Sequence, residues 1–241
     1  TQFTEKHSNK NSYSAFCEDI NKHVIVLTEY RNILSDIDTS GSFFQRLGSV
    51  GYMLQSYYEL HSNKKYDESV RYSFGFEGFL DNLRGVSSHY SSGYISAAQL
   101  DNTSSCSFKK QYYPGHIDET DCIKNNCELD KKLIITGPNA SGKTTMLKST
   151  TINVICSQQI GCGFYESAVI NPYTHIHSYL NIPDTSERDS LFQAESRRCK
   201  EIIDSIVKCP SEEGYRHFGI FDELYSGTNP NEATKSGFAF L

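Results

Sequence analysis

The residues that most constrain the fold form a glycine-bracketed loop, GPNASGKT, which runs from Gly137 to Thr144. They fit the spacing G-x-x-x-x-G-K-[S/T], follow the apolar run LIIT (residues 133–136) and precede a helix-compatible run. Glycines let the backbone bend so that successive N–H groups converge, and the following helix adds the positive end of its dipole. Strand, loop and helix in this order predict a binding site for nucleotide phosphates. Its members are Gly137, Pro138, Asn139, Ala140, Ser141, Gly142, Lys143, Thr144 and Thr145.

Two side chains of this loop indicate what it binds. Lys143 would neutralise the β- and γ-phosphates, and the Thr144 hydroxyl would be a ligand of Mg²⁺. We therefore expect ATP and Mg²⁺ as cofactors.

A second apolar run, FGIF (residues 218–221), ends in two adjacent carboxylates, Asp222 and Glu223. Asp222 would complete the Mg²⁺ site with Thr144, and Glu223 would polarise the attacking water. The alternative is a strand followed by a charged turn. Such a pair after a strand is typical of ABC-type ATPases, which convert ATP and water to ADP and phosphate at sites shared by two subunits. The transporter signature LSGGQ is absent, which weakens the transporter, cohesin-like and Rad50-like interpretations.

The apolar pattern divides the chain into a helical part, residues 1–104, and a mixed part, residues 105–241. Three- and four-residue spacings predict packed helices within the first part, with breaks near residues 38–41 and 62–65. The segments concerned are 24–34, 43–60 and 74–83, and the aromatic residues expected in their core are Tyr57, Tyr58, Phe74 and Phe76. In the second part, short β-like runs alternate with helical patterns, which predicts an α/β domain with a mainly parallel sheet.

Composition limits the other functions of the chain. The net charge of −6 argues against a general nucleic-acid-binding surface. No apolar run is long enough for a membrane helix, so we expect no membrane partner. Eight scattered cysteines without a secretory signal indicate reduced thiols of an intracellular protein, nuclear or cytoplasmic, rather than a zinc site.

The segment between the two phosphate motifs predicts a capped helix. Ser190 is a good N-cap, and Gln193 would complete a capping box. Apolar residues then recur in one stripe that we expect to be buried: Cys199, Ile202, Ile203, Ile206 and Val207. An ordinary surface helix would fit the segment alone, but its position between the two motifs favours a functional role for Ser190.

These motifs together resemble the MutS family of DNA mismatch-repair ATPases. SLFQAE (residues 190–195) is similar to the family's serine–x–phenylalanine–x–x–glutamate signature, and GPNASGKTT to its phosphate loop. QQIGCGFYESA (residues 158–168), with Glu166-Ser167 in place of a proline, and FDELYSGTNPNEA (residues 221–233) resemble further family segments. The resemblance covers residues 105–241 well, and the helical part resembles the MutS core and lever helices less specifically.

The resemblance implies an ABC-type P-loop ATPase domain that follows a helical core and lever segment, in a fragment of a longer protein. ATP hydrolysis would drive clamp-like changes on DNA, which other parts of the protein would contact. The functional unit would be a dimer with a MutS-like subunit, in which Ser190 reaches the partner's γ-phosphate. The alternatives are a MutS relative that acts in recombination or replication, and a nucleotide-gated scaffold with little turnover.

The sequence departs from the family pattern at two points. Cys122 stands where many MutS proteins stack adenine on an aromatic ring, and the family's switch histidine would lie beyond Leu241. His217 is no substitute because it precedes the strand. We therefore expect this chain to bind nucleotide more readily than it hydrolyses it.

Overall fold

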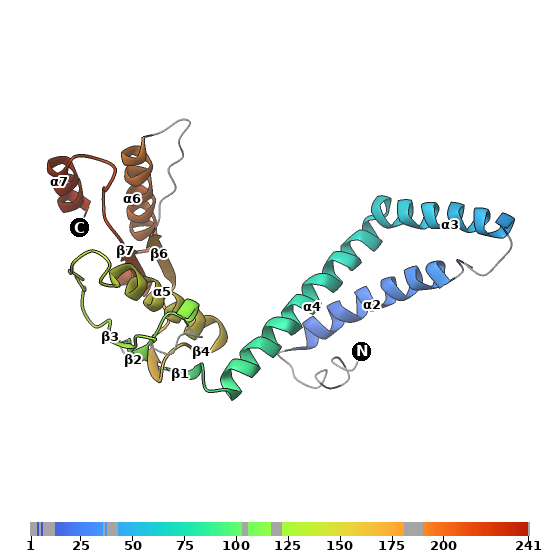
Figure 1. The fold of residues 1–241 in the computed structure, drawn as a ribbon, viewed down its shortest axis with the longest axis horizontal. Coiled ribbons are helices and arrows are strands. Elements are labelled where there is room, and N and C mark those ends of the chain that lie inside the picture. Colours follow the sequence, from blue (N-terminus) through green and yellow to red (C-terminus); the bar gives the residue numbers. More distant parts are fainter. Residues whose placement is uncertain are drawn as a thin grey trace. The chain divides into compact units, whose positions relative to one another are not determined.

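The protein folds into two compact units, Thr1–Ser88 and His89–Leu241 (Figure 1). The structure, a computed structural model, describes residues 4, 6, 13–35, 37, 43–102, 106–116, 122–180 and 190–240, with backbone alone for 43–47. Within these residues, no helix is long and apolar enough to cross a membrane. All eight cysteines are free thiols.

The first unit is helical, as predicted. It contains α2 (Ser14–Ser35), α3 (Phe43–Ser62) and most of α4 (Lys64–Ser91). The predicted break at residues 62–65 is confirmed, because Asn63 interrupts the helices and its side-chain oxygen accepts a hydrogen bond from the Lys65 N–H at 3.1 Å. The other predicted break, at residues 38–41, lies outside the described residues.

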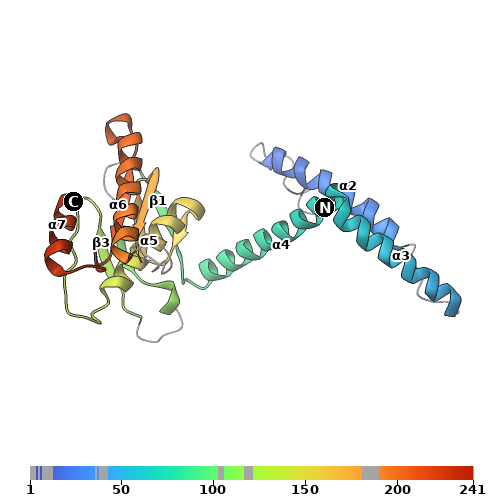
Figure 2. The same ribbon diagram turned by 90° about the horizontal axis from the view of Figure 1, so that it is seen from above.

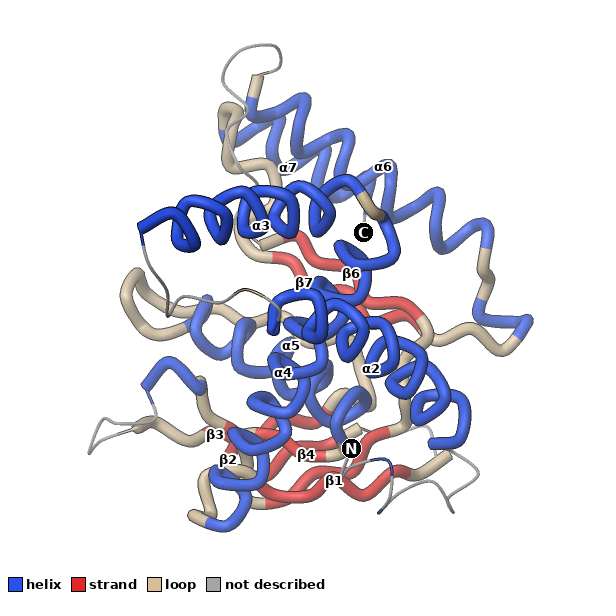
Figure 3. Tube along the Cα trace, turned by 90° about the vertical axis from the view of Figure 1, so that its right-hand side faces the viewer, coloured by secondary structure: helices blue, strands red, loops and turns tan. Residues whose placement is uncertain are grey.

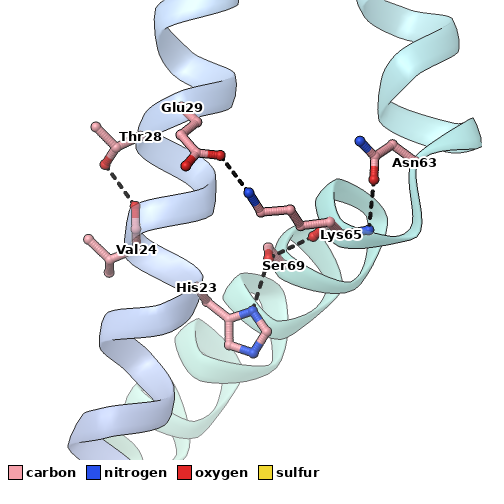
Figure 4. A network of polar contacts seen from close by, with 7 residues as sticks. All are labelled: His23, Val24, Thr28, Glu29, Asn63, Lys65 and Ser69. Atoms are coloured by element: carbon pink, nitrogen blue, oxygen red, sulfur yellow. Dashed lines mark hydrogen bonds and ion pairs between the residues drawn. The ribbon is translucent and has the colours of Figure 1, made fainter.

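Polar contacts join α2 to the first half of α4 (Figure 4). Lys65 and Glu29 form an ion pair at 2.6 Å. The Ser69 hydroxyl donates to the Lys65 carbonyl at 2.8 Å, so its oxygen is free to accept a hydrogen bond from His23 Nδ1 at 3.0 Å. Because these partners are shared between two helices, they fix the register in which α2 lies against α4.

Aromatic pairs show that α2 and α4 run antiparallel. Phe16, near the start of α2, contacts Phe79 with ring centroids 5.8 Å apart. Tyr30, near the end of α2, instead contacts Tyr66, early in α4, at 5.0 Å. The contact partners in α4 therefore come earlier in the sequence as α2 proceeds, which is the pattern of an antiparallel pair.

Three of the four aromatic residues predicted for the core of this unit are exposed instead: Tyr57 (65%), Tyr58 (72%) and Phe74 (75%). The prediction was wrong for these three, and Phe76 is half-buried. Among the side chains that the structure describes on α3 and α4, the buried ones are Ser56 and Ser69, each 2% exposed. A helix that contacts a neighbour along one narrow stripe buries only that stripe, and small polar residues occupy it here where the helices approach closely.

The second unit contains two sheets (Figure 3). The larger has the strand order β3-β2-β5-β1-β4, and the smaller pairs β6 with β7. The strands are β1 (Ser96–Leu100), β2 (Ser107–Gln111), β3 (Asn125–Glu128), β4 (Cys162–Gly163), β5 (Ser167–Ile170), β6 (His175–Tyr179) and β7 (His217–Phe221). The pairs β1–β5 and β6–β7 are parallel, whereas β1–β4, β2–β3 and β2–β5 are antiparallel. The larger sheet is therefore mixed, where a mainly parallel sheet was expected, since β2 and β3 lie close in sequence and return antiparallel.

One of the two predicted strands is present. FGIF lies in β7, but residues 132–138, which include LIIT, form no strand. Ile134 is 89% exposed, and residues 133–135 line a cavity of about 1110 Å³ together with β7. An apolar run forms a strand only if it can pair with a free strand edge, and no described strand pairs with this segment.

The helices of the second unit are α5 (Lys143–Ile160), α6 (Leu191–Lys208) and α7 (Pro230–Phe240), with short 3₁₀ turns at Pro114–His116 and Ser211–Glu213. A core of nine buried residues includes side chains of α5, of the larger sheet and of β7: Cys106, Phe108, Cys127, Val154, Tyr165, Ala168, Ile170, Phe218 and Ile220. A smaller cluster of Tyr179, Cys199 and Tyr225 packs with side chains of α6 and α7. Figure 2 shows the backbones of these two helices.

The predicted buried stripe of α6 is confirmed only in part. Cys199 and Ile202 are buried, at 3% and 2% exposure. Ile203, Ile206 and Val207 are 44%, 40% and 72% exposed. The five apolar positions are spread around more of the circumference of α6 than β6 covers, so some of them stay exposed.

Helix α5 is held by buried polar groups. The Asn153 side chain, fully buried, accepts a hydrogen bond from the Phe164 N–H at 2.7 Å and donates to the Phe164 carbonyl at 3.2 Å. Asn153 thus ties the middle of α5 to the chain between β4 and β5, which fixes the helix that begins at the glycine-rich loop.

We predict that Asn153→Ala lowers the free energy of unfolding by about 2–3 kcal/mol, because both backbone groups of Phe164 lose their partner. Urea denaturation followed by circular dichroism measures the change. Asn126→Ala is the matched control: this exposed amide accepts one hydrogen bond, from the Lys110 N–H, and its loss should cost less than about 1 kcal/mol. Equal losses in the two variants would contradict the prediction.

Candidate functional site

The glycine-rich loop forms an exposed turn before α5 and wraps around the ammonium group of Lys143. Lys143 Nζ donates to the carbonyl oxygens of Gly137 and Pro138, each at 2.9 Å. Gly142 has φ +86, in the left-handed region that favours glycine. A Cβ on Gly137 would come within 2.9 Å of Ser141 Oγ. The backbone path therefore favours glycine at position 142, and at position 137 the close approach of the Ser141 side chain leaves little room for a Cβ.

The loop leads directly into the N-terminus of α5. Gly142 is the N-cap and supplies no side-chain hydrogen bond, so the first N–H groups of the helix have no partner from the cap. These N–H groups and the positive end of the helix dipole favour an anion at this position.

Two motifs far apart in the sequence meet at Thr144. Its hydroxyl donates to Asp222 Oδ2 at 2.7 Å, across 78 residues. The Asp222 N–H donates to the Tyr179 carbonyl at 3.0 Å, which continues the β6–β7 pairing past the end of β7. A hydroxyl and a carboxylate held together in this way are oxygen ligands of the kind that Mg²⁺ prefers.

Glu223 follows at once and is exposed. Its backbone has φ +49, so the chain turns sharply immediately after Asp222. A non-glycine residue in this conformation is uncommon and is often found at functional sites. The turn leaves the Glu223 side chain open to solvent next to the Thr144–Asp222 pair.

Ser190 begins α6 as predicted. Its hydroxyl accepts a hydrogen bond from the Gln193 N–H at 3.4 Å, and the Gln193 side chain accepts one from the Ser190 N–H at 2.9 Å. The predicted capping box is therefore confirmed. Ser190 is exposed, so its hydroxyl is open to a ligand from outside the chain.

The predicted site residues occupy four places in the second unit. Gly137, Pro138, Asn139, Ala140, Ser141 and Gly142 form the loop; Lys143, Thr144 and Thr145 form the first turn of α5; Asp222 and Glu223 follow β7; and Ser190 caps α6. Hydrogen bonds join the loop to Lys143, and Thr144 to Asp222.

A cavity of about 390 Å³ opens beside the loop. Its lining combines Lys143 and Thr145 with Tyr113, His116 and Cys122. The rings of Tyr113 and His116 lie 5.4 Å apart. The volume falls within the range of small-molecule sites. Sequence reasoning pointed to Cys122 here but missed the two rings, although the aromatic run just before Pro114 was a usable signal.

Three imidazoles lie together where β6 pairs with β7. His217 Nε2 donates to the Cys209 carbonyl at 2.6 Å, which leaves Nδ1 to accept from His177 Nε2 at 2.9 Å. The ring of His175 stacks on that of His217 at 4.8 Å. Burial, followed by the neighbouring charges of His217, His175 and Arg198, lowers the pKa of His177 below its ordinary value.

The His177 shift predicts a loss of stability in acid. A histidine whose pKa is lowered by folding leaves stability unchanged above the unfolded pKa of about 6.5. Below that pH the unfolded state binds the extra proton, so stability falls by up to about 1.4 kcal/mol per pH unit until the folded pKa is reached. Urea denaturation between pH 7.5 and 5 should show a shallower fall for His177→Gln than for the unaltered protein. The exposed His61 supplies the control, since His61→Gln should keep the original slope; an unchanged slope in His177→Gln would contradict the assignment.

Comparison with known proteins gives partial matches. The chain is 30% identical over 116 residues to the DNA mismatch repair protein MutS of Staphylococcus saprophyticus, a match that covers 47% of this chain and 12% of the relative. It is 29% identical over 126 residues to the endonuclease MutS2 of Thermus thermophilus, covering 50% and 16%. With the endonuclease MutS2 of Lactococcus lactis it shares 26% over 182 residues, covering 74% and 23%. No protein-family model matches.

These matches support a relationship with the MutS family over about half of the chain. The chain spans less than a quarter of the length of the three relatives, at 12%, 16% and 23%. The relatives belong to a family of DNA repair proteins, and the activity of the whole protein is proposed from that relationship.

Proposed function

We propose that the chain is the ATP-binding and hydrolysing part of a MutS-like DNA repair protein. The observation that carries the proposal is the hydrogen bond between Thr144 and Asp222 at 2.7 Å. It brings a hydroxyl at the start of α5 and a carboxylate after β7 to one point beside a phosphate-type loop. Two oxygen ligands at that point suit a Mg²⁺ ion bound to ATP.

The loop would hold the phosphates of ATP. The N–H groups at the start of α5, which receive no side-chain hydrogen bond from the N-cap, and the helix dipole suit the anionic charge, and Lys143 would exchange its two carbonyl partners for phosphate oxygens. Glu223, exposed and directly after Asp222, would orient and polarise the attacking water. We also propose that this unit has the ABC-type fold.

The cavity beside the loop would take the base. Tyr113 and His116 offer flat faces on which a purine can stack, whereas Cys122 offers none. This arrangement provides stacking without a ring at position 122, so base recognition would depend on the two rings.

The family relationship supports action on DNA, and we propose in addition that the chain assembles as a dimer. Relatives that match about half of this chain are named DNA mismatch repair proteins. Ser190, exposed at the start of α6, would contact the γ-phosphate bound by a MutS-like partner subunit. ATP hydrolysis at the shared sites would then change the grip of the whole protein on DNA.

We predict that Lys143→Ala weakens ATP binding at least tenfold, because the phosphates lose their charged partner. Equilibrium titration with a fluorescent ATP analogue and Mg²⁺ measures the affinity. Lys148→Ala, one turn further along the same helix, is the matched control and should bind as the unaltered chain does. If Lys143→Ala and the unaltered chain bind equally, the loop does not hold phosphate.

Glu223→Gln separates an ATPase from a nucleotide-gated scaffold. In an ATPase the change should leave ATP binding within about threefold and lower hydrolysis by about 10²–10⁴-fold, since the group that polarises water is lost. Release of phosphate from ATP and Mg²⁺, measured beside the binding titration, gives both quantities. A scaffold would show tight binding and equally low turnover before and after the substitution.

A second candidate is a MutS relative that acts on branched DNA in recombination or replication. It is favoured by two matches to proteins named endonuclease MutS2 that cover 73% and 74% of this chain, against 47% and 48% for proteins named MutS. Other proteins named endonuclease MutS2 match 50% and 52% of the chain. Stimulation of ATP hydrolysis by a four-way junction but not by a mismatched duplex would favour this candidate. Stimulation by the mismatched duplex would favour mismatch repair.

A further inference from the structure

A buried carboxylate on α6 holds the loop that follows the Asp222-Glu223 pair. Glu195 is 2% exposed although its side chain is polar. Its Oε1 accepts hydrogen bonds from the Ser226 N–H at 2.9 Å and the Ser226 hydroxyl at 3.1 Å, and its Oε2 accepts one from the Gly227 N–H at 3.2 Å. Burying a carboxylate costs free energy unless hydrogen bonds replace its water, and these donors supply that replacement.

Tyr179 connects the clamp formed by these three hydrogen bonds to β6. Its hydroxyl accepts a hydrogen bond from the Tyr225 N–H at 3.1 Å. Burial is the main cause that raises the pKa of Tyr179, and the nearby Glu195 carboxylate raises it further, so the phenol stays protonated. The loop after β7 is therefore held from two elements: from α6 by the hydrogen bonds to Glu195, and from β6 by Tyr179.

The loop is also shaped to lie against the first turn of α6. Tyr225 has φ +58, and its ring packs against Phe192 with centroids 5.5 Å apart. Gly227 lies so close to Leu191 that a Cβ there would meet the Leu191 Cγ at 2.7 Å. These contacts are independent of the Glu195 hydrogen bonds, and they place the same loop against the same helical turn.

In the proposed function, the clamp connects two groups that would act on two separate ATP molecules. Asp222 and Glu223 stand at the start of the clamped loop, on the ATP site of their own chain. Ser190 stands one turn before Glu195, at the exposed end of α6 that would face the partner's ATP. Two consecutive backbone N–H groups bound by one carboxylate allow little independent movement between the loop and this helical turn.

We propose that Glu195 is a positioning residue that couples the ATP site of its own chain to Ser190, an inference that rests on the proposed function. A movement of the Asp222-Glu223 segment when Mg²⁺ and ATP bind is passed through Ser226 and Gly227 to the first turn of α6. Nucleotide binding to one chain would thereby change the position of Ser190 at the ATP site of its partner.

Hydrogen exchange of the whole chain, with and without Mg²⁺ and a non-hydrolysable ATP analogue, tests this coupling. In the unaltered chain, the nucleotide should slow exchange both in residues 137–145 and in residues 190–195. In Glu195→Gln the first effect should persist and the second should fall at least fivefold, because an amide offers one acceptor oxygen instead of two. Glu201→Gln is the control: it removes an exposed partner of Arg198 on the same helix and should keep both effects. A full effect at residues 190–195 in Glu195→Gln would overturn the proposal.

Two further readouts keep the outcome decisive. If Glu195→Gln fails to fold, Ser226→Ala removes one donor without touching the charge and should still reduce the effect at residues 190–195; an undiminished effect would overturn the coupling. If the nucleotide does not alter hydrogen exchange anywhere in the unaltered chain, that result contradicts the proposed function and not the clamp. The clamp is then judged by the Ser226 and Gly227 amides alone, which should exchange at least tenfold faster in Glu195→Gln and would exchange equally if the clamp were absent.

Discussion

The hydrogen bond between Thr144 and Asp222 is the contact on which the candidate site depends. It closes a chain segment of 78 residues, and neither motif could form a metal site without the other. Its geometry follows from the parallel register of β6 and β7, in which Tyr179 pairs with Phe221 and the next N–H, that of Asp222, bonds to the Tyr179 carbonyl. The position of one carboxylate oxygen is thus determined by a strand ladder, and the loop at residues 137–142 supplies the charge-binding surface around it.

Buried polar groups act together with the apolar core to keep the surrounding elements in place. Asn153 fixes α5 to the chain near Phe164 through two hydrogen bonds, and Glu195 fixes α6 to the loop after β7 through bonds to Ser226 and Gly227. In both cases the partners are backbone groups, so the interaction specifies the path of a segment and not only its proximity. The loss of such a group leaves donors or acceptors unsatisfied in the interior, which makes these positions sensitive to small changes.

Local motifs in the sequence were sufficient to predict the local chemistry. The capping box at Ser190 and Gln193 and the strand that precedes Asp222 depend on residues within a few positions of each other, and both are present. The helical segments of the first unit were predictable for the same reason, because apolar spacing is a property of a single helix. The break at Asn63 likewise follows from a local polar run.

Features that depend on which surfaces meet could not be predicted in this way. Spacing identified α3 as amphipathic but could not tell that Ser56 faces its neighbour while Tyr57 is exposed. The run at residues 133–136 has strand composition, yet a strand needs an edge to pair with, and sequence carries no record of which edges are free. The role of Glu195 was hidden for a related reason: a glutamate in a helix is usually a solvated residue. Its 2% exposure and its hydrogen bonds to Ser226 and Gly227, across a gap in sequence that no local pattern spans, show that this glutamate faces inwards.

The Lys143 ammonium and the Glu195 carboxylate make opposite uses of backbone groups. Lys143 binds two carbonyl oxygens of an exposed loop, where water can replace either partner at little cost, so the lysine is free to exchange them for phosphate oxygens. Glu195 binds two N–H groups in a buried position, where no water competes and each lost bond leaves an unsatisfied group. The exposed contact is therefore suited to change when a nucleotide binds, and the buried one to stay intact while it transmits the movement. A site that must respond to a ligand without losing its shape needs both kinds of contact, and here they lie on either side of the Thr144–Asp222 pair.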